Sequence, residues 1–201
     1  MDSIKKNLWL IITLAVLIVF VAIPLPPSDL LLRITYEDPG TGAMQLYYGT
    51  DANPGLSDAQ SVTGVISPEE QCITFRLDRS LAGHLTALRF DFPHTDQMIV
   101  LKDVALSSGG TVQKSYLSCD FFSETRCTEL RNVHIDRVPA QSETVFVTTA
   151  DDPYFFFSQE ALQELQGCYS SRRGTRLFVA LLVLAGILLA RRKVFPDGAP
   201  Q

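Results

Sequence analysis

The sequence predicts an all-β fold: an extracytoplasmic antiparallel β-sandwich, of the jelly-roll type, flanked by two transmembrane α-helices. Three observations lead to this prediction. Two long apolar runs lie near the ends of the 201-residue chain, short runs of period two fill the segment between them, and all four cysteines lie in that segment. The middle segment has the size of one ordinary domain.

The first apolar run, LWLIITLAVLIVFVAI, contains one polar residue and no charge. With its flanks it would span nearly 30 Å as a helix, so residues 8–25 are predicted to cross a bilayer. Lys5 and Lys6 also fit the start of a cleaved signal peptide, which is the alternative. A retained signal anchor is favoured, because Phe20 and Ala22 do not form a pair of small residues at the cleavage positions.

The second apolar run, LFVALLVLAGILLA, predicts a second transmembrane helix over residues 175–190. Its length of about 21 Å is short for a hydrocarbon layer of about 30 Å, and Arg176 and Arg191 would reach out to the two interfaces. A buried or interfacial helix is the alternative. Gly186 and Ala190 would allow a neighbouring helix to approach closely.

Charges and cysteines place the middle segment outside the cytoplasm. Basic residues precede the first run and follow the second, so residues 1–7 and 191–201 are predicted as cytoplasmic tails. An even number of cysteines between the runs suits an oxidising compartment. The protein is therefore predicted to be a two-pass protein of the cell (inner) membrane. Residues 30–168 would form its extracytoplasmic or periplasmic domain.

The four cysteines, Cys72, Cys119, Cys127 and Cys168, allow three disulfide pairings. The short loop CDFFSETRC makes the Cys119–Cys127 bond the least costly to close, which leaves Cys72 to pair with Cys168. A zinc site is the alternative, but the chain has no CxxC pair. No metal or other cofactor is therefore expected.

Apolar and polar residues alternate from residue 30 onward, and turn residues interrupt the pattern. LLLRITY ends at EDPGTG, MQLYYG is followed by the loop TDANPGLSDAQ, and SPEE separates SVTGVI from QCITFRL. Many short strands, spaced by about 8–14 residues, are typical of an antiparallel sandwich. Within the domain only ALQEL (161–165) predicts a helix. The predicted strands are 30–36, 44–49, 61–66, 71–77, 85–92, 98–106, 111–117, 130–135, 143–149 and 153–158.

The middle segment is strongly acidic. Residues 29–170 contain 20 Asp and Glu against 9 Lys and Arg, a net charge of −11. This balance excludes nucleic acid as a partner and argues against binding to anionic lipid through the exposed surface. His84, His94 and His134 have no common ligand spacing, and GxSxG and SxxK nucleophile patterns are absent from the sequence.

Two groups of residues are candidates for binding a ligand. In LRFDF, Arg89 and Asp91 share one face of a strand, with the apolar residues on the other. Adjacent aromatic residues in strands point to opposite faces, so one ring of each pair is available to a ligand. Aromatic rings near Asp or Arg suit sugar recognition, and core packing is the alternative. The candidate ligand-binding residues are Tyr47, Tyr48, Arg89, Asp91, Asp152 and Tyr154.

The turn Asp151–Asp152–Pro153 brings two carboxylates together. Such a pair can hold calcium or act on a glycosidic bond, but a glycosidase needs two carboxylates at a set separation across a cleft. The alternative is a simple turn, in which an Asp side chain bonds to the backbone before Pro.

Four stretches together resemble a known family: QLYYGTDANPGLSDAQSV (45–62), ITFRLDRSLAGHLTALRFDF (73–92), IVLKDVAL (99–106) and TTADDPYFFF (148–157). They are similar to the β-sandwich of bacterial membrane glycosyltransferase-like proteins of cell-surface polysaccharide assembly. The resemblance covers residues 30–160 and implies a galactose-binding-like jelly roll, in which Arg89 and Asp91 are architectural. The multi-helix catalytic portion of the larger family members is absent from this sequence.

The sequence therefore predicts a non-catalytic, membrane-anchored accessory protein of envelope glycan assembly. It would bind glycan or dock onto a membrane glycosyltransferase, with the lipid bilayer as a further partner. One alternative is a small carboxylate-dependent glycan hydrolase using Asp91, Asp151 or Asp152. Another is a purely structural membrane-proximal module that binds no sugar.

Overall fold

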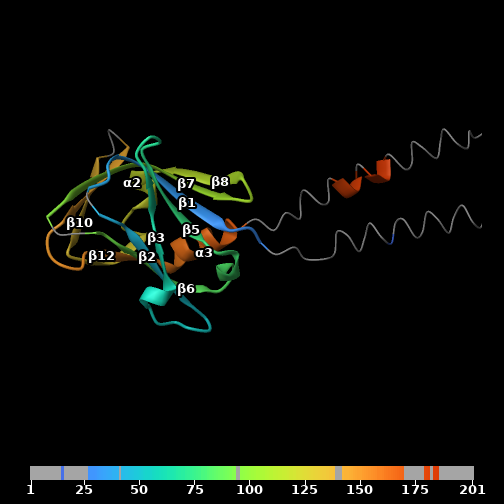
Figure 1. Cartoon of the computed structure of the whole chain (residues 1–201), viewed down its shortest axis with the longest axis horizontal. Coiled ribbons are helices and arrows are strands. Elements are labelled where there is room, and N and C mark those ends of the chain that lie inside the picture. The colour runs from blue at the N-terminus through green and yellow to red at the C-terminus, as the bar shows by residue number, and fades with distance from the viewer. Residues whose placement is uncertain are drawn as a thin grey trace, which may run out of the picture. The chain divides into compact units, whose positions relative to one another are not determined.

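The structure is a computed structural model that describes residues 15, 27–40, 42–93, 96–138, 142–169, 179–181 and 183–185. Residues 27–170 form a compact unit of their own. Two antiparallel sheets build this unit (Figure 1). The predicted β-sandwich is thus confirmed in outline, whereas the jelly-roll and galactose-binding-like assignments are finer and stay predictions.

The elements follow one another along the chain without long interruptions. The strands are β1 (Leu30–Asp38), β2 (Gln45–Thr50), β3 (Ser61–Thr63), β4 (Val65–Ser67), β5 (Cys72–Leu77), β6 (Leu85–Asp91), β7 (Met98–Ser108), β8 (Thr111–Leu117), β9 (Cys127–Arg131), β10 (Val133–Val138), β11 (Glu143–Thr148) and β12 (Tyr154–Phe157). The helices are α2 (Ser118–Phe121) and α3 (Gln159–Gly167), with 3-10 turns η1 (Asp58–Gln60) and η2 (Arg79–Leu81).

The seven-stranded sheet is built around β7. Among the described residues its order is β10-β11-β7-β1-β5-β4, and β8 also pairs with β7. β1 runs along one edge of β7, while β11 pairs with residues 98–101 and β8 with residues 103–108 of the other edge. β7 is long enough to have two successive neighbours on one side.

The five-stranded sheet has the order β3-β2-β6-β12-β9 within the described part of the chain. β6 lies at its centre, paired with β2 on one edge and β12 on the other. Its inward side chains Leu88 and Phe90 are fully buried, whereas Arg89 and Asp91 lie on the outer face. This alternation is the one that the sequence predicts for LRFDF.

Two runs that the sequence predicts as single strands are each divided between the sheets. Residues 61–66 split at Gly64 into β3 and β4, and residues 130–135 split at Asn132 into β9 and β10. A Cβ on Gly64 would lie 2.6 Å from Ile73 and 2.9 Å from Phe75, so only glycine fits there. Asn132 has φ 53°, a left-handed conformation that asparagine adopts more readily than most residues.

Aromatic rings join the two sheets in the core. Phe90 and Phe155 of the five-stranded sheet are stacked with centroids 5.4 Å apart, and Phe155 is stacked on Phe146 of the seven-stranded sheet at 5.8 Å. All three side chains are fully buried. Offset pairs of this kind contribute about 0.5–1.5 kcal/mol each beyond the apolar area that they bury.

Helix α3 covers one end of the sandwich, where the sequence predicts a helix over residues 161–165. Its first turn is capped by Ser158, whose side chain accepts a hydrogen bond from the Ala161 amide. Leu162 and Leu165 are buried. Gln166 donates a hydrogen bond of 2.6 Å to the Leu85 carbonyl, which attaches the helix to β6.

Glu164 ties α3 to both sheets. Its carboxylate pairs with Lys114 and with Arg126, and it accepts a hydrogen bond of 2.6 Å from the Tyr116 hydroxyl. Lys114 and Tyr116 belong to β8, whereas Arg126 immediately precedes β9. Burial acts to raise the pKa of Glu164, but its three donors together lower that pKa to about 2. Burial, followed by the hydrogen bond to Glu164 and the Glu164 charge, raises the pKa of Tyr116 to about 12.

The prediction of two transmembrane helices, and with it the two-pass inner-membrane location, is overturned. Among the described residues no helix is long and apolar enough to cross a bilayer. A span needs about 20 apolar residues, whereas α3 has nine residues. The predicted segments 8–25 and 175–190 lie largely, and the tails 1–7 and 191–201 entirely, outside the described residues.

The predicted disulfides are not formed in the structure. Cys72 is the first residue of β5, which spans about 17 Å. At the other end of β5, Tyr169, the neighbour of Cys168, donates its hydroxyl to the Asp78 carbonyl at 3.3 Å. None of the four cysteines forms a disulfide in the structure, so no such bond links Cys72 to Cys168 there.

The loop between Cys119 and Cys127 is organised by hydrogen bonds instead of a disulfide. In the helical turn α2, the Phe122 amide donates a hydrogen bond to the Ser118 carbonyl. In the turn that follows, the Cys127 amide donates a hydrogen bond to the Ser123 carbonyl. Cys127 belongs to the core, whereas Cys119 is half-buried on α2.

We expect peptide mapping of the unreduced chain to find no peptide pair linked through Cys72 and Cys168, because both cysteines are free in the structure. The same digest after reduction and alkylation serves as the control, since it should give identical cysteine-containing peptides. A linked pair that disappears on reduction would contradict this arrangement.

Replacing Glu164 by Gln should lower the free energy of unfolding by about 2 kcal/mol at pH 7, because charge-assisted hydrogen bonds are lost. The carboxylate has a folded pKa of about 2 against an ordinary value of 4.5. Its stabilisation is therefore complete above pH of about 4.5 and disappears as the pH falls towards 2.

Urea unfolding at several pH values measures this contribution. The difference between the original chain and E164Q should stay constant above pH of about 5 and shrink below it. Glu160 is exposed on the same helix, so E160Q is the matched control. We expect E160Q to change the free energy of unfolding by less than about 1 kcal/mol. Equal losses in E164Q and E160Q would show that Glu164 does not tie α3 to the sheets.

Candidate functional site

The outer face of the five-stranded sheet carries polar and aromatic side chains in aligned rows. Antiparallel pairing places Gln45, Asp91 and Tyr154 side by side across β2, β6 and β12. The next outward row contains Tyr47 and Arg89. Because successive side chains of a strand alternate between faces, both rows point away from the aromatic core.

Arg89 is the centre of this face. Its guanidinium carbon lies 4.8 Å from the centroid of the Tyr47 ring and 4.5 Å from that of the Tyr154 ring. Its Nε and Nη2 atoms donate to the two oxygens of Asp91 at 2.7 and 2.6 Å. Arginine suits this position because its planar group stacks on rings and binds a carboxylate through two parallel bonds.

The Arg89–Asp91 pair is largely shielded from water. The side chains are 21% and 14% exposed, respectively. Burial raises the pKa of Asp91, with a smaller contribution in the same direction from the Asp152 charge, whereas the hydrogen bonds from Arg89 oppose it. Asp91 raises the pKa of Arg89 against the effect of burial, so the guanidinium keeps its charge.

The Asp151–Asp152 turn adjoins this face. The Asn132 side chain donates to the Asp151 carbonyl at 2.5 Å, and the Phe92 amide donates to the Pro153 carbonyl at 3.0 Å. Asp152 has φ 56°, in the left-handed region. The turn is therefore held in a strained conformation by its neighbours, which is frequent at binding sites.

A long loop supports the other side of the face. The Tyr47 hydroxyl donates to Gln45 at 3.0 Å and bonds to Asp58 at 3.1 Å. Burial, followed by the hydrogen bond to Asp58, raises the pKa of Tyr47. The Gln60 side chain binds the carbonyls of Tyr48 and Asn53, so the loop folds back on the end of β2.

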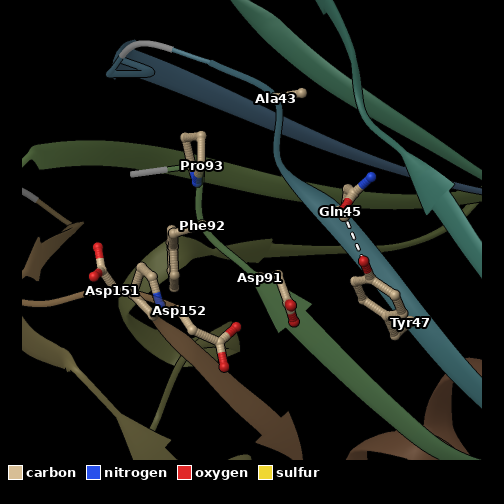
Figure 2. Close-up of a pocket in the computed structure, with 9 residues that line it drawn as sticks. Ala43, Gln45, Tyr47, Asp91, Phe92, Pro93, Asp151 and Asp152 are labelled. Atoms are coloured by element: carbon tan, nitrogen blue, oxygen red, sulfur yellow. Dashed lines mark hydrogen bonds between the residues drawn. The ribbon is translucent and has the colours of Figure 1, made fainter. Parts of the chain in front are cut away.

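A pocket of about 340 Å³ lies between β2, the end of β6 and the turn. Figure 2 shows Gln45 and Tyr47 on β2 to one side of Asp91, and the Asp151–Asp152 turn to the other side. The polar residues that line the pocket are Gln45, Tyr47, Asp91, Asp151 and Asp152. Ala43, Phe92, Pro93 and Pro153 complete the wall.

Most of the candidate residues from the sequence come together here. Tyr47, Asp91 and Asp152 line the pocket, and Arg89 and Tyr154 form the stack beside it. Tyr48 does not belong to the site, because its side chain lies on the opposite face of β2 and packs against the core. Sequence reasoning missed Gln45, although its spacing of two residues from Tyr47 places it on the same face.

The other candidate centres lie apart from this pocket. His84 contacts Asp51 and His134 contacts Asp136 in exposed pairs, while His94 lies outside the described residues. Within the part of the chain that the structure describes, no group of three or more His, Cys, Asp or Glu residues could hold a metal ion. The geometry therefore gives no basis for a calcium site at the Asp151–Asp152 turn.

Comparisons of the chain with protein-family models, curated proteins and solved structures find no match. The resemblance to the polysaccharide-assembly sandwich therefore stays a prediction from the sequence.

Replacing Arg89 by Ala should lower the free energy of unfolding by about 2–3 kcal/mol. Asp91 would lose its partner in a shielded position, and two rings would lose the stacked cation. Urea unfolding is the measurement. R33A is the matched control, because the Arg33–Glu70 pair is exposed (46% and 61%) and should contribute less than about 1 kcal/mol.

Lysine at position 89 provides a second comparison. R89K keeps the charge but loses the planar fork, so we expect most of the R89A effect to persist. Equal losses in R89A and R33A would mean that the stack does not stabilise this face.

Proposed function

We propose that the sandwich is a non-catalytic carbohydrate-binding module and that the pocket beside Asp91 receives the glycan. The observation that carries this proposal is a pocket of about 340 Å³ that is lined by Gln45, Asp91 and Asp152, with the Asp152 carboxylate on the side of Asp91 (Figure 2). Such a volume lies at the small end of ligand pockets and suits one or two sugar rings. Carboxylate and amide oxygens accept hydrogen bonds from sugar hydroxyls.

The support comes from polar contacts and not from an aromatic platform. Arg89 covers one face of Tyr47 and one face of Tyr154, and Arg131 lies 5.7 Å from the Tyr154 centroid. The Tyr47 and Tyr154 rings therefore stack on arginine side chains, and the ring faces covered in this way are not accessible to a sugar. A ligand in the pocket would bind Asp91, Asp152 and Gln45 through its hydroxyl groups.

The pairing of Asp91 favours binding over hydrolysis. A glycosidase acid must carry a proton at the working pH, whereas both Asp91 oxygens accept hydrogen bonds from a charged guanidinium. Asp151 and Asp152 are adjacent in one turn and do not form a pair across a cleft. We therefore propose that the module recognises a glycan without cleaving it.

A role in glycan assembly follows only from the sequence resemblance. In that setting the module would hold a polysaccharide for a glycosyltransferase partner.

A bulky side chain placed in the pocket tests the proposal, because it blocks the space but leaves the polar groups of the pocket in place. Ala43 is exposed and lines the pocket, so A43W would place an indole in the space that a sugar needs. We expect the full chain to bind glycans on an array and A43W to bind the same glycans at least about tenfold more weakly.

A52W is the matched control, because Ala52 is equally exposed but lies outside the pocket. Both variants should unfold at the same urea concentration as the original chain. The proposal fails if no glycan on the array binds the chain, or if A43W binds as tightly as A52W. Hydrolysis of a bound glycan by the purified chain would overturn its non-catalytic part.

A further inference from the structure

The turn that brings Asp152 to the pocket is fastened at both ends to one corner of the chain. This corner, Arg131–Asn132, lies where the chain leaves β9 of the five-stranded sheet and enters β10 of the seven-stranded sheet. The Thr149 amide donates to the Asn132 carbonyl at 3.0 Å, and Tyr154 pairs with Arg131. The start and the end of the turn therefore rest on the same two residues.

The Asn132 side chain also holds the middle of the turn. Its Nδ2 atom donates to the Asp151 carbonyl at 2.5 Å, and this carbonyl belongs to the peptide group that leads into Asp152. Beyond Asp152, the Phe92 amide donates to the Pro153 carbonyl at 3.0 Å. The backbone is thereby held on both sides of Asp152.

Asp152 needs this support because its backbone is strained. Its φ of 56° lies in the left-handed region, which is uncommon for residues other than glycine. Asp152 also precedes a proline, and a residue in that position favours an extended backbone. Without its attachments the turn would relax, and the Asp152 carboxylate would leave its place on the side of Asp91 (Figure 2).

Asparagine suits position 132 because it meets two requirements at once. Asn132 has φ 53°, and asparagine adopts the left-handed conformation more readily than most residues. Its side chain also supplies the N–H donor for the Asp151 carbonyl. Glycine and aspartate meet the first requirement but lack this donor.

We infer that Asn132 is a positioning residue of the pocket, which holds the strained turn so that the Asp152 carboxylate is in place before a ligand arrives. This inference rests on the proposed carbohydrate binding and adds a residue on which its geometry depends. Asn132 is not among the residues that line the pocket, so it acts through the turn. A binding group that is already held in place avoids the entropic cost of being ordered by the ligand.

Glycan binding by the full chain in mild detergent measures this effect. N132G removes the amide but accepts the left-handed backbone, so we expect the glycans of the array to bind it at least about fivefold more weakly. Q166E is the matched control, because Gln166 also donates its side-chain amide to a backbone carbonyl, that of Leu85 at 2.6 Å. Leu85 and Asp91 are the two ends of β6, so Q166E should lose stability without losing affinity.

A double-variant cycle shows whether Asn132 acts through Asp152. D152G removes the carboxylate and accepts the left-handed conformation, so N132G/D152G should bind the glycans as D152G does. Hydrogen exchange of the chains without glycan gives a second readout. The Thr149 amide should exchange at least about threefold faster in N132G than in the original chain, and at the original rate in Q166E.

The outcomes separate this inference from the proposed function. The positioning role is overturned if N132G binds glycans as tightly as the original chain, or if N132G weakens binding equally with and without the Asp152 side chain. Unchanged exchange of the Thr149 amide in N132G would overturn it without reference to any glycan. If no glycan binds the original chain while this amide exchanges faster in N132G, the proposed function fails, and with it the role of Asn132 in binding.

Discussion

The register of β6 between β2 and β12 is the constraint on which both the core and the candidate site depend. It stacks Phe90 on Phe155 inside the sandwich, and it aligns Arg89 and Asp91 with Tyr47 and Tyr154 outside. Successive side chains alternate, so a shift by one residue would exchange the two sets and expose the phenylalanines. The packing energy of the core thereby maintains the geometry of the polar face. A binding surface on such a sheet is more rigid than one made of loops alone.

Two shielded ionic clusters complete this framework in different ways. The Arg89–Asp91 pair lies within one sheet and gives its outer face a fixed shape. The Glu164 cluster joins α3 to β8 of one sheet and to the start of β9 in the other. Removing charges from water is costly, and Arg89 offsets the cost with two hydrogen bonds to Asp91 and two ring contacts. Arg126 has two ring contacts and a hydrogen bond from Nη1 to Glu164, whereas its buried Nε and Nη2 atoms have no hydrogen-bond partner among the described residues.

Local alternation predicted the strands well, and it failed where the chain changes sheets. Residues 61–66 and 130–135 look like continuous strands, because nothing in their pattern shows that Gly64 must avoid Phe75 or that Asn132 turns left-handed. Loop length favours a Cys119–Cys127 bond and leaves Cys72 to pair with Cys168 by elimination, whereas none of the four cysteines forms a disulfide in the structure. The two membrane helices were inferred from hydropathy, and among the described residues no helix meets the length and apolarity that a span requires.

The sequence by itself determined the class of the domain, its acidity and the outward face shared by Arg89 and Asp91, because period-two alternation and charge are local properties. It also marked Tyr47, Asp152 and Tyr154 as candidates. The tertiary structure decided that these residues meet, that Tyr48 turns to the core and that Gln45 joins the pocket. It decided as well that Arg89 is enclosed by two rings instead of being offered to a ligand. Those outcomes depend on the pairing of strands distant in the chain, which alternation along a single strand does not specify.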